Sequence, residues 1–338
     1  MKTNRHTIHD IARLAGVGAG TVSRVLNNRP NVSEATRERV LQAIRELDYR
    51  PSFSARHMRT QRSHLIGFIT DEVATTPYAG DIIRGAQERA WADERILLVI
   101  NVGLNLSMAE AAIETMLERQ VEGVIYAAMF HREVMLPANV HKTLTVLANC
   151  YAADRALPSV VPDERMGGRV AAETLLRAGH RRVGLINVNT LESGMPAALD
   201  RFQGYQDALI EAGIPLDEHI VRHGDGSPEL GYRYTHELMA ETDPPTAIFC
   251  GTDRTALGAY DALRELSLRV PEDVAVIGFD NMEIIASALR PPLTTVQLPH
   301  YQMGQWAVDY LIRHNLNHSP VSAVQHRLAC PLVLRDSV

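Results

Sequence analysis

TIHDIARLAGVGAGTVSRVLN, residues 7–27, is the most informative segment of the chain. Its apolar residues recur at helical spacing on both sides of a glycine-rich break, at Ile8, Ile11, Ala12 and Ala15 and then at Val22, Val25 and Leu26. Thr7 is a favoured N-cap for the first helix, and Ser33 is one for a third apolar helical pattern that ends near Leu47. Two short helices joined by a tight turn, with a third helix completing the core, predict a helix-turn-helix module.

The charge of the chain is distributed unevenly. The whole sequence has 34 Lys and Arg, 40 Asp and Glu and a net charge of −6. Residues 1–62 have 12 Lys and Arg against 5 Asp and Glu, or +7, which leaves 22 against 35, or −13, for residues 63–338. A basic amino-terminal region on an acidic remainder predicts that only the former contacts a polyanion.

The second helix of a helix-turn-helix enters the major groove of DNA, so its residues outside the core are the candidate DNA contacts. We expect Arg24 to donate two hydrogen bonds to guanine, a contact that discriminates between bases by about 1–3 kcal/mol. Hydroxyl side chains near the helix starts suit phosphate oxygens. The predicted DNA-binding residues of this module are Thr7, Ala19, Gly20, Thr21, Ser23, Arg24 and Asn27.

The order of these residues resembles the headpiece of the lactose-repressor and galactose-repressor (LacI/GalR) family. The resemblance includes residues 7–12 (TIHDIA) and 21–27 (TVSRVLN), and it continues without a gap through residues 47–51 (LDYRP). The chain departs from the family at Ala19 and Gly20, where two larger base-reading residues usually stand. We therefore expect operator specificity to depend on Arg24, the hinge and DNA shape.

Residues 51–64 are the expected hinge helix and linker. Pro51 ends the third helix, and the segment that follows is too short to form a stable helix alone. The family resemblance implies a helix that folds on DNA, where two copies lie in the minor groove and insert an apolar side chain between bases. Met58 stands where the family usually has Leu. The predicted hinge contacts to DNA are Ser54, Ala55, Arg56 and Met58.

Beyond residue 64, short buried strand patterns alternate with helical patterns. The strand patterns lie at residues 65–69, 96–102, 124–126, 144–147, 183–186, 247–250 and 274–277 and near Ile220. The helical patterns lie at residues 82–92, 108–120, 167–178, 201–212, 230–240 and 255–266. Repeated strand-helix units predict parallel sheets covered by helices, and the restart of the cycle after Pro162 predicts two lobes with a ligand cleft between them.

The family resemblance extends over this core, for example at residues 179–184, 244–250 and 291–296. It implies a fold similar to that of periplasmic sugar-binding proteins, with three crossings between the lobes. The expected fold class is a small all-α helix-turn-helix headpiece plus an α/β core of two parallel-sheet lobes. The expected domains are residues 1–50 for the headpiece, 51–64 for the hinge and 65–338 for the ligand-binding and dimerisation core, with lobe 1 at 65–162 and 295–324 and lobe 2 at 163–294 and 325–338.

The resemblance also implies a set of ligand-binding residues. Arg201 and Asp280 match a ligand-binding arginine and aspartate of the family, and an arginine and a carboxylate can donate to and accept from neighbouring sugar hydroxyls. Thr252 replaces a common Asn, and His300 stands where an aromatic residue is frequent. The alternative for each residue is a helix cap or a salt bridge. The full predicted set is Asp71, Tyr78, Asp81, Arg201, Thr252, Asp253, Arg254, Asp280 and His300.

Mixed charges among these residues favour a neutral polyol such as a mono- or oligosaccharide, so we expect a repressor of carbohydrate-utilisation genes that a sugar releases from DNA. A corepressor-dependent regulator that binds a purine or a sugar phosphate is the alternative. A sugar-active enzyme with a fused headpiece is a second one, but the sequence has no phosphate-binding loop and no nucleophile elbow.

The remaining expectations concern assembly and location. The three cysteines are far apart, and the 14 histidines form no cluster, so we expect no disulfide framework, no metal and no cofactor. No apolar run reaches the roughly 18 residues that span a bilayer, which predicts a cytoplasmic protein. The chain stops soon after Arg335 without heptad repeats, so we expect a homodimer that binds a palindromic double-stranded operator.

Overall fold

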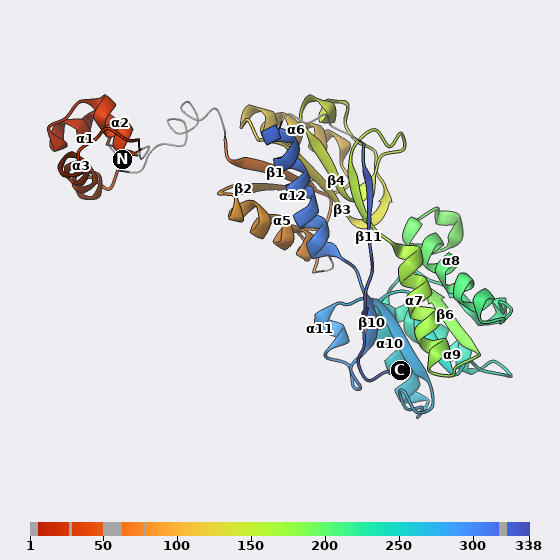
Figure 1. The fold of residues 1–338 in the computed structure, drawn as a ribbon. Helices are drawn as coiled ribbons and strands as arrows, with labels where there is room; N and C mark the ends of the chain where they lie inside the picture. The colour runs from red at the N-terminus through yellow and green to blue at the C-terminus, as the bar shows by residue number, and fades with distance from the viewer. Residues whose placement is uncertain (1–5, 27–28, 50–62, 78, 318–322) are drawn as a thin grey trace. The chain divides into compact units, whose positions relative to one another are not determined.

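The structure is a computed structural model that describes residues 6–26, 29–49, 63–77, 79–317 and 323–338 (Figure 1). Its internal contacts divide the chain into two units, Met1–Ser63 and His64–Val338, which are described separately. Some of the predicted functional residues lie outside the described residues, namely Asn27, Ser54, Ala55, Arg56, Met58 and Tyr78.

The amino-terminal unit contains the three predicted helices. They are α1 (Ile8–Ala15), α2 (Ala19–Leu26) and α3 (Glu34–Glu46). Asp10 accepts hydrogen bonds of 2.8 Å from both the backbone N–H and the hydroxyl of Thr7, which fixes the start of α1. Gly16 ends α1 with a φ of 64°, a left-handed conformation that favours glycine. The three helices share one buried core that includes Ile11, Val22 and Val40.

Lobe 1 of the core is built on a sheet with the order β11-β5-β4-β3-β1-β2, in which all pairs are parallel. Its strands are β1 (Leu65–Thr70), β2 (Ile96–Asn101), β3 (Val124–Glu133), β4 (Thr145–Tyr151), β5 (Ser159–Pro162) and β11 (Gln325–Leu328). Its helices are α5 (Gly80–Ala92), α6 (Leu106–Glu118), the 3₁₀ turn Ala138–Lys142 and α12 (His300–Asn317).

Lobe 2 repeats this architecture with the order β12-β10-β9-β8-β6-β7, in which only the β10–β12 pair is antiparallel. Its strands are β6 (Val183–Asn187), β7 (Val221–His223), β8 (Ala247–Cys250), β9 (Ala275–Asp280), β10 (Thr294–Gln297) and β12 (Leu332–Val333). Its helices are α7 (Glu164–Arg177), α8 (Pro196–Glu211), α9 (Pro228–Met239), α10 (Asp253–Glu265) and α11 (Glu283–Ala286), with 3₁₀ turns at Leu191–Ser193 and Glu218–Ile220.

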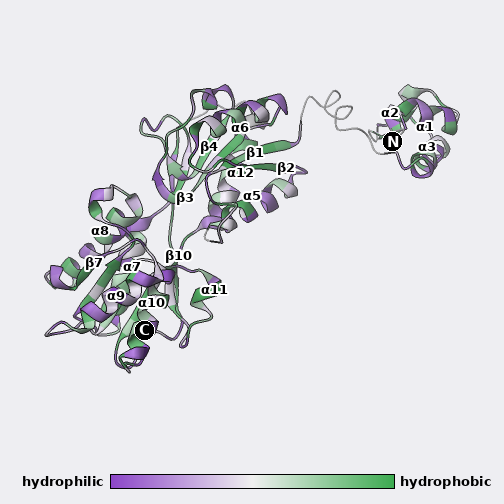
Figure 2. Cartoon of the chain, turned by 180° about the vertical axis from the view of Figure 1, so that it is seen from behind, coloured by the Kyte–Doolittle hydropathy of each residue, from purple (hydrophilic) through white to green (hydrophobic). Residues whose placement is uncertain are grey.

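The strands of both lobes are buried on two faces, which explains their nearly continuous apolar sequences. In β1, for example, Phe68 packs with the core beneath α5 and α12, and Ile69 packs with the opposite core beneath α6. Figure 2 shows the hydrophobic strands in green and the hydrophilic outer faces of the helices in purple. The predicted fold class is therefore confirmed.

Glycines occupy three helix crossings, where the backbones approach too closely for a side chain. The crossings α5–α12, α7–α8 and α9–α10 each have a glycine on both helices, namely Gly85 and Gly304, Gly168 and Gly204, and Gly231 and Gly258. A Cβ atom on Gly168 would lie 2.3 Å from the carbonyl oxygen of Arg201. The α7–α8 crossing therefore fixes the backbone that holds Arg201.

The structure corrects two of the predicted lobe boundaries. We expected the chain to return to lobe 1 after residue 294 and to leave it after residue 324. Instead, β10 pairs with β9 in lobe 2, and β11 pairs with β5 in lobe 1. Both crossings come a few residues later than predicted, because each segment first completes a strand in the sheet that it leaves.

Candidate functional site

The second helix of the amino-terminal unit presents the residues predicted to read DNA. Gly20 and Arg24 are exposed, whereas Ala19, Thr21 and Ser23 are half-buried. Val22 and Val25 of the same helix are buried in the three-helix core. This division leaves one face of α2 available for a groove of DNA.

Thr7 also has a structural role in this unit. Its hydroxyl donates to Asp10 in the cap of α1, and the hydrogen bonds from Thr7 hold the pKa of the Asp10 carboxyl below its ordinary value. A phosphate contact from the Thr7 side chain would compete with that hydrogen bond. The sequence prediction for Thr7 did not consider this cost.

The two lobes of the core enclose a small cavity of about 40 Å³ that is lined by both polar and apolar residues, which we call the inner cavity. Lobe 1 and lobe 2 both contribute to its lining, with Leu298 and His300 of the crossing between them. The lining residues are Met129, Phe130, His131, Asn149, Glu164, Val188, Ala197, Arg201, Thr252, Asp280, Leu298 and His300.

Arg201 is the central charged group of the inner cavity. It is buried, and its Nε atom donates a 2.7 Å hydrogen bond to Glu164. Its Nη1 atom donates to the carbonyl oxygen of Gly251 and lies 3.7 Å from Asp280 Oδ1. The guanidinium carbon also lies 3.7 Å from the centre of the Phe279 ring. These contacts hold the guanidinium in one orientation toward the cavity.

Residues at two strand ends bring acceptors into the inner cavity with unusual backbone conformations. Asn149 on β4 has a φ of 57°, and Asp280 at the end of β9 has a φ of 114°. Such angles cost energy for residues with side chains and cluster at functional sites. Burial raises the pKa of the Asp280 carboxyl well above its ordinary value, against the opposing effect of Arg201. One acceptor therefore comes from each lobe.

Three polar atoms of the inner cavity are buried without a hydrogen-bond partner among the described residues. They are His131 Nδ1, Asn149 Oδ1 and His300 Nε2. Burial lowers the pKa of both histidines to about 4, so both rings are neutral near pH 7 and each can donate and accept a hydrogen bond. Buried polar atoms normally find partners, so these atoms mark a place for a polar ligand.

A larger pocket of about 470 Å³ adjoins the inner cavity and shares Asp280, Leu298 and His300 with it. We call it the Asp81 pocket, because Asp81 of α5 also lines it, beside Arg84. Asp81 and Arg84 form an exposed ion pair of 3.1 Å. Together the two spaces contain five of the predicted ligand residues, namely Asp81, Arg201, Thr252, Asp280 and His300.

Other predicted ligand residues have structural roles, as the alternative interpretation foresaw. Asp253 is buried, and its two oxygens accept hydrogen bonds from the Thr295 hydroxyl (2.5 Å) and the Met282 N–H (2.6 Å). Asp71 is also buried, and it accepts hydrogen bonds from the Met129 N–H and from Arg132, each 2.9 Å long. These two aspartates are not among the lining residues of either space, so their role as ligand contacts stays a prediction.

Thr252 and Arg254, the residues on either side of Asp253, differ in whether they line the inner cavity. Thr252 does line the inner cavity, but its hydroxyl accepts from the Thr255 N–H (3.0 Å) as the N-cap of α10 and donates to Gly226 O (3.1 Å). Arg254 is half-buried and is not among the lining residues of the inner cavity or the Asp81 pocket.

Sequence reasoning missed His131, Asn149 and Glu164. Asn149 follows the predicted strand at residues 144–147, so the rule that ligands bind at strand ends could have found it. Glu164 comes just after the crossing from lobe 1 and is buried against Arg201. No local pattern marks His131, which reaches the cavity from the long strand β3.

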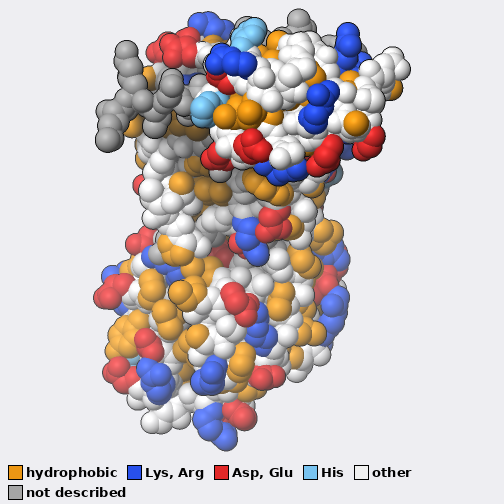
Figure 3. Space-filling view, turned by 90° about the vertical axis from the view of Figure 1, so that its left-hand side faces the viewer, with side chains coloured by type: hydrophobic (Ala, Val, Ile, Leu, Met, Phe, Trp, Pro, Cys, Tyr) orange, Lys and Arg blue, Asp and Glu red, His pale blue; other side chains and the backbone are white. Residues whose placement is uncertain are grey.

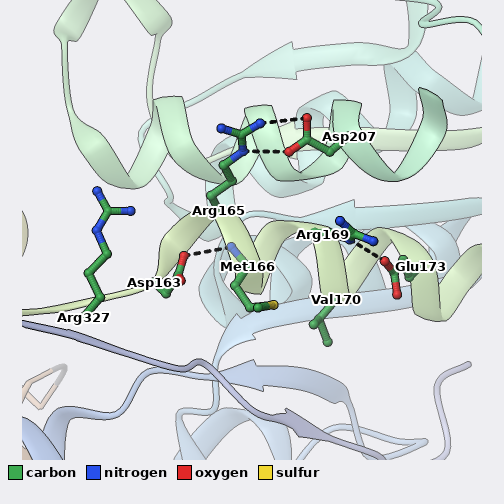
Figure 4. Close-up of a pocket in the computed structure, with 8 residues that line it drawn as sticks. All are labelled: Asp163, Arg165, Met166, Arg169, Val170, Glu173, Asp207 and Arg327. Carbon is green, nitrogen blue, oxygen red and sulfur yellow. Dashed lines mark hydrogen bonds and ion pairs between the residues drawn. The ribbon is translucent and has the colours of Figure 1, made fainter. Parts of the chain in front are cut away.

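A larger pocket along α7 is a poorer candidate. It has a volume of about 680 Å³ and lies along α7, so we call it the α7 pocket. Figure 4 shows that two of its three arginines are already paired, Arg165 with Asp207 and Arg169 with Glu173. Figure 3 shows similar mixing of basic (blue) and acidic (red) side chains over the lower part of the view, which is lobe 2. Exposed charges that are already paired gain little free energy by binding a ligand.

A helix-turn-helix unit joined to a two-lobed α/β core with a cavity between the lobes defines a class of protein, the ligand-responsive DNA-binding regulator. The model for bacterial regulatory proteins of the lacI family matches residues 7–52, and the model for a periplasmic binding protein-like domain matches residues 172–338. The chain belongs to the lacI family of transcriptional regulators, which confirms the resemblance found in the sequence.

Relatives match the chain over nearly its whole length. The sucrose operon repressor of Escherichia coli is 35% identical over 98% of this chain and 99% of its own, and the ribose operon repressor of Haemophilus influenzae is 30% identical over 98% of each. The lac repressor dimer bound to operator and the anti-inducer ONPF is 28% identical, with a TM-score of 0.81 over 99% of both chains. The regulator CelR in complex with cellobiose is 29% identical, with a TM-score of 0.67 over 99% of this chain and 100% of that one.

Within the described residues, no helix is both long enough and apolar enough to span a bilayer. The same part of the chain contains no group of three or more His, Cys, Asp or Glu side chains arranged to hold a metal ion.

Proposed function

We propose that this regulator represses carbohydrate-utilisation genes and that a sugar bound between the lobes releases it from its operator. The observation that carries the proposal is the inner cavity, which Arg201 and Asp280 line together with three buried polar atoms that have no partner among the described residues. Fixed donors and acceptors in a buried site suit the paired hydroxyls of a sugar. The names of relatives that control sucrose and ribose operons support the same ligand class.

The charges of the inner cavity disfavour the alternative, a purine or sugar-phosphate corepressor. Glu164 and Asp280 give this cavity two carboxylates, and Arg201 is the one arginine among its lining residues. The Arg201 guanidinium already contacts both carboxylates. A phosphate would add charge of the same sign as the carboxylates without gaining a free cation, whereas a neutral sugar avoids that repulsion.

Ligand entry requires the lobes to separate. The inner cavity of about 40 Å³ has room for only a few water molecules and is far smaller than the roughly 300–1,000 Å³ of ligand-binding pockets. The lobes are joined by three chain crossings, which allow rotation about a common hinge. A sugar that binds one arrangement of the lobes better than another shifts the population toward it, and this shift is the signal that reaches the headpiece.

Dimerisation supplies the second headpiece that a palindromic operator needs. Several large apolar side chains are exposed on lobe 1, at Trp91, Ile96 and Val99, and Ile284 is exposed on lobe 2. Exposed apolar groups of this size mark interaction surfaces. We propose that both lobes contact the second subunit through these residues, that the protein acts in the cytoplasm, where its operator is, and that it binds the sugar without converting it.

The proposal can be tested with the full-length chain and an operator selected from random duplexes. Fluorescence anisotropy should show binding of the labelled operator at low salt and release on addition of one sugar from a panel. Chromatography should recover that sugar unchanged. Operator binding that no sugar of the panel alters, or consumption of the sugar, would contradict the proposed function.

A further inference from the structure

A third space adjoins the inner cavity at His131. It has a volume of about 430 Å³ and is lined by residues of both lobes and of the crossing strand β11. We call it the Asp200 pocket. Its lining includes His131, Tyr151, Leu199, Asp200 and Arg327.

His131 connects this pocket to the inner cavity, because its side chain lines both. The ring is almost fully buried, its Nδ1 atom has no hydrogen-bond partner among the described residues, and it lies 3.8 Å from Glu164 Oε1. The Tyr151 ring packs edge-on against it, with 5.8 Å between ring centres. A molecule longer than one sugar ring could therefore contact Arg201 on one side of His131 and Asp200 on the other.

The charged groups of the Asp200 pocket are available for a ligand. Within the described part of the chain, neither the Asp200 carboxylate nor the Arg327 guanidinium has a hydrogen bond or ion pair. Burial raises the pKa of the Asp200 carboxyl, against the smaller, lowering effect of the charge of Arg327. Figure 4 shows the contrast on the neighbouring surface, where Arg165 and Arg169 carry dashed lines to carboxylates and Arg327 carries none. Asp200 can accept and Arg327 can donate, which is the combination that recognises neighbouring hydroxyls.

The remaining lining is apolar or held in place. Val161, Pro196 and Leu199 present apolar surface, on which the C–H face of a sugar ring can pack. Arg155 lies 3.4 Å from the centre of the Tyr151 ring and donates a 3.3 Å hydrogen bond to Gln325, so Tyr151 is fixed before any ligand arrives. The site is thus preformed to a large extent.

We propose that the Asp200 pocket binds the second unit of a di- or oligosaccharide whose first unit occupies the inner cavity. This inference rests on the proposed function, because it assumes a sugar ligand between the lobes. It specifies that the effector is longer than a monosaccharide and that Asp200, Arg327 and Tyr151 select for that length.

Calorimetric titration of the full-length protein tests the inference with glucose, fructose and galactose and with sucrose, cellobiose, maltose and lactose. We expect one disaccharide to bind about tenfold or more tightly than either of its component monosaccharides. Arg327→Gln should weaken binding of that disaccharide about tenfold, since it removes a charged hydrogen-bond donor, and should change monosaccharide binding less than about twofold. Asp200→Asn should act in the same direction.

Arg165→Gln is the matched control, because Arg165 lies in the α7 pocket and not in the Asp200 pocket. It should leave all affinities unchanged. The inference is overturned if a monosaccharide binds as tightly as any disaccharide, or if Arg327→Gln and Asp200→Asn weaken both classes of sugar equally or not at all. Failure of every sugar in the panel to bind would instead overturn the proposed function and the inference together.

Discussion

The inner cavity and the α7 pocket both contain arginines and carboxylates, yet they differ in the hydrogen-bond partners that those charged groups have. In the α7 pocket, Arg165 and Arg169 are exposed and paired with carboxylates on α7 and α8. In the inner cavity, Arg201 is buried, and nearby polar atoms of His131 and His300 have no partner among the described residues. Burial combined with unsatisfied polar groups, more than volume, is therefore the basis on which we propose the ligand site.

The largest expected difference between the two sites is in stability. Arg201→Met should destabilise the core by about 3–5 kcal/mol, because it leaves Glu164 and Asp280 as buried carboxylates without a cation. Arg169→Met, in the α7 pocket, should have a much smaller effect, since water solvates its partners. Urea unfolding of both variants measures the difference. An equal loss in the free energy of unfolding for both variants would contradict this difference between the two arginines.

A smaller difference should appear in ligand affinity. Asp280→Asn removes a charged acceptor from the inner cavity, so we expect sugar binding to weaken about tenfold to a hundredfold. Asp207→Asn changes a carboxylate of the α7 pocket in the same way and should leave sugar affinity unchanged. Titration of both variants with the sugar that binds the wild-type protein measures the effect. A loss in Asp207→Asn as large as in Asp280→Asn would remove the distinction between the sites.

A substitution at the α7–α8 crossing should change stability and sugar binding, because this crossing holds the backbone of Arg201. Gly168→Ala places a Cβ atom 2.3 Å from the Arg201 carbonyl oxygen, so we expect a destabilisation of about 1–3 kcal/mol and weaker sugar binding. Gly80→Ala is the control, because nothing lies within 4 Å of the added atom. Thermal unfolding and titration measure both effects. Wild-type behaviour of Gly168→Ala would mean that the helices separate without moving the site.

A further expected effect concerns pH. Burial raises the pKa of Asp253 to about 7, against the hydrogen bonds from Thr295 and Met282. The unfolded chain loses this proton near pH 4 and the folded chain only near pH 7, so this group lowers stability as pH rises across that window. In Asp253→Asn the fall should be shallower than in the wild type, as urea unfolding from pH 4 to pH 7 would show. Parallel curves would contradict this assignment.

The sequence allowed the headpiece and the two-lobed core to be predicted, because helical spacing and buried strand runs are local signals. The prediction from the sequence placed the first residues of several core helices too late in the chain. Helices α6, α7 and α9 begin right after the N-caps Asn105, Asp163 and Ser227, whose side chains accept from backbone N–H groups. The apolar pattern that we followed starts only after the first polar turn, whereas the capping residues mark the boundary.

The site was only partly predictable for a different physical reason. Arg201 and Asp280 carried a family resemblance, but the roles of Asp253 and Thr252 depend on contacts with residues distant in the sequence, such as Thr295 and Gly226. No local pattern distinguishes an aspartate that accepts from its own protein from one that accepts from a ligand. His131 became a candidate only when folding buried it between the lobes.

The central claim is that sugar binding between the lobes and operator binding by the headpiece are coupled. Linkage requires that each ligand change the affinity of the other by the same factor. Titration of the effector sugar into free protein and into operator-saturated protein measures this factor directly. The account predicts weaker sugar binding to the operator complex, by the same ratio with which the sugar weakens operator binding. Equal sugar affinity in the presence and absence of the operator would contradict it.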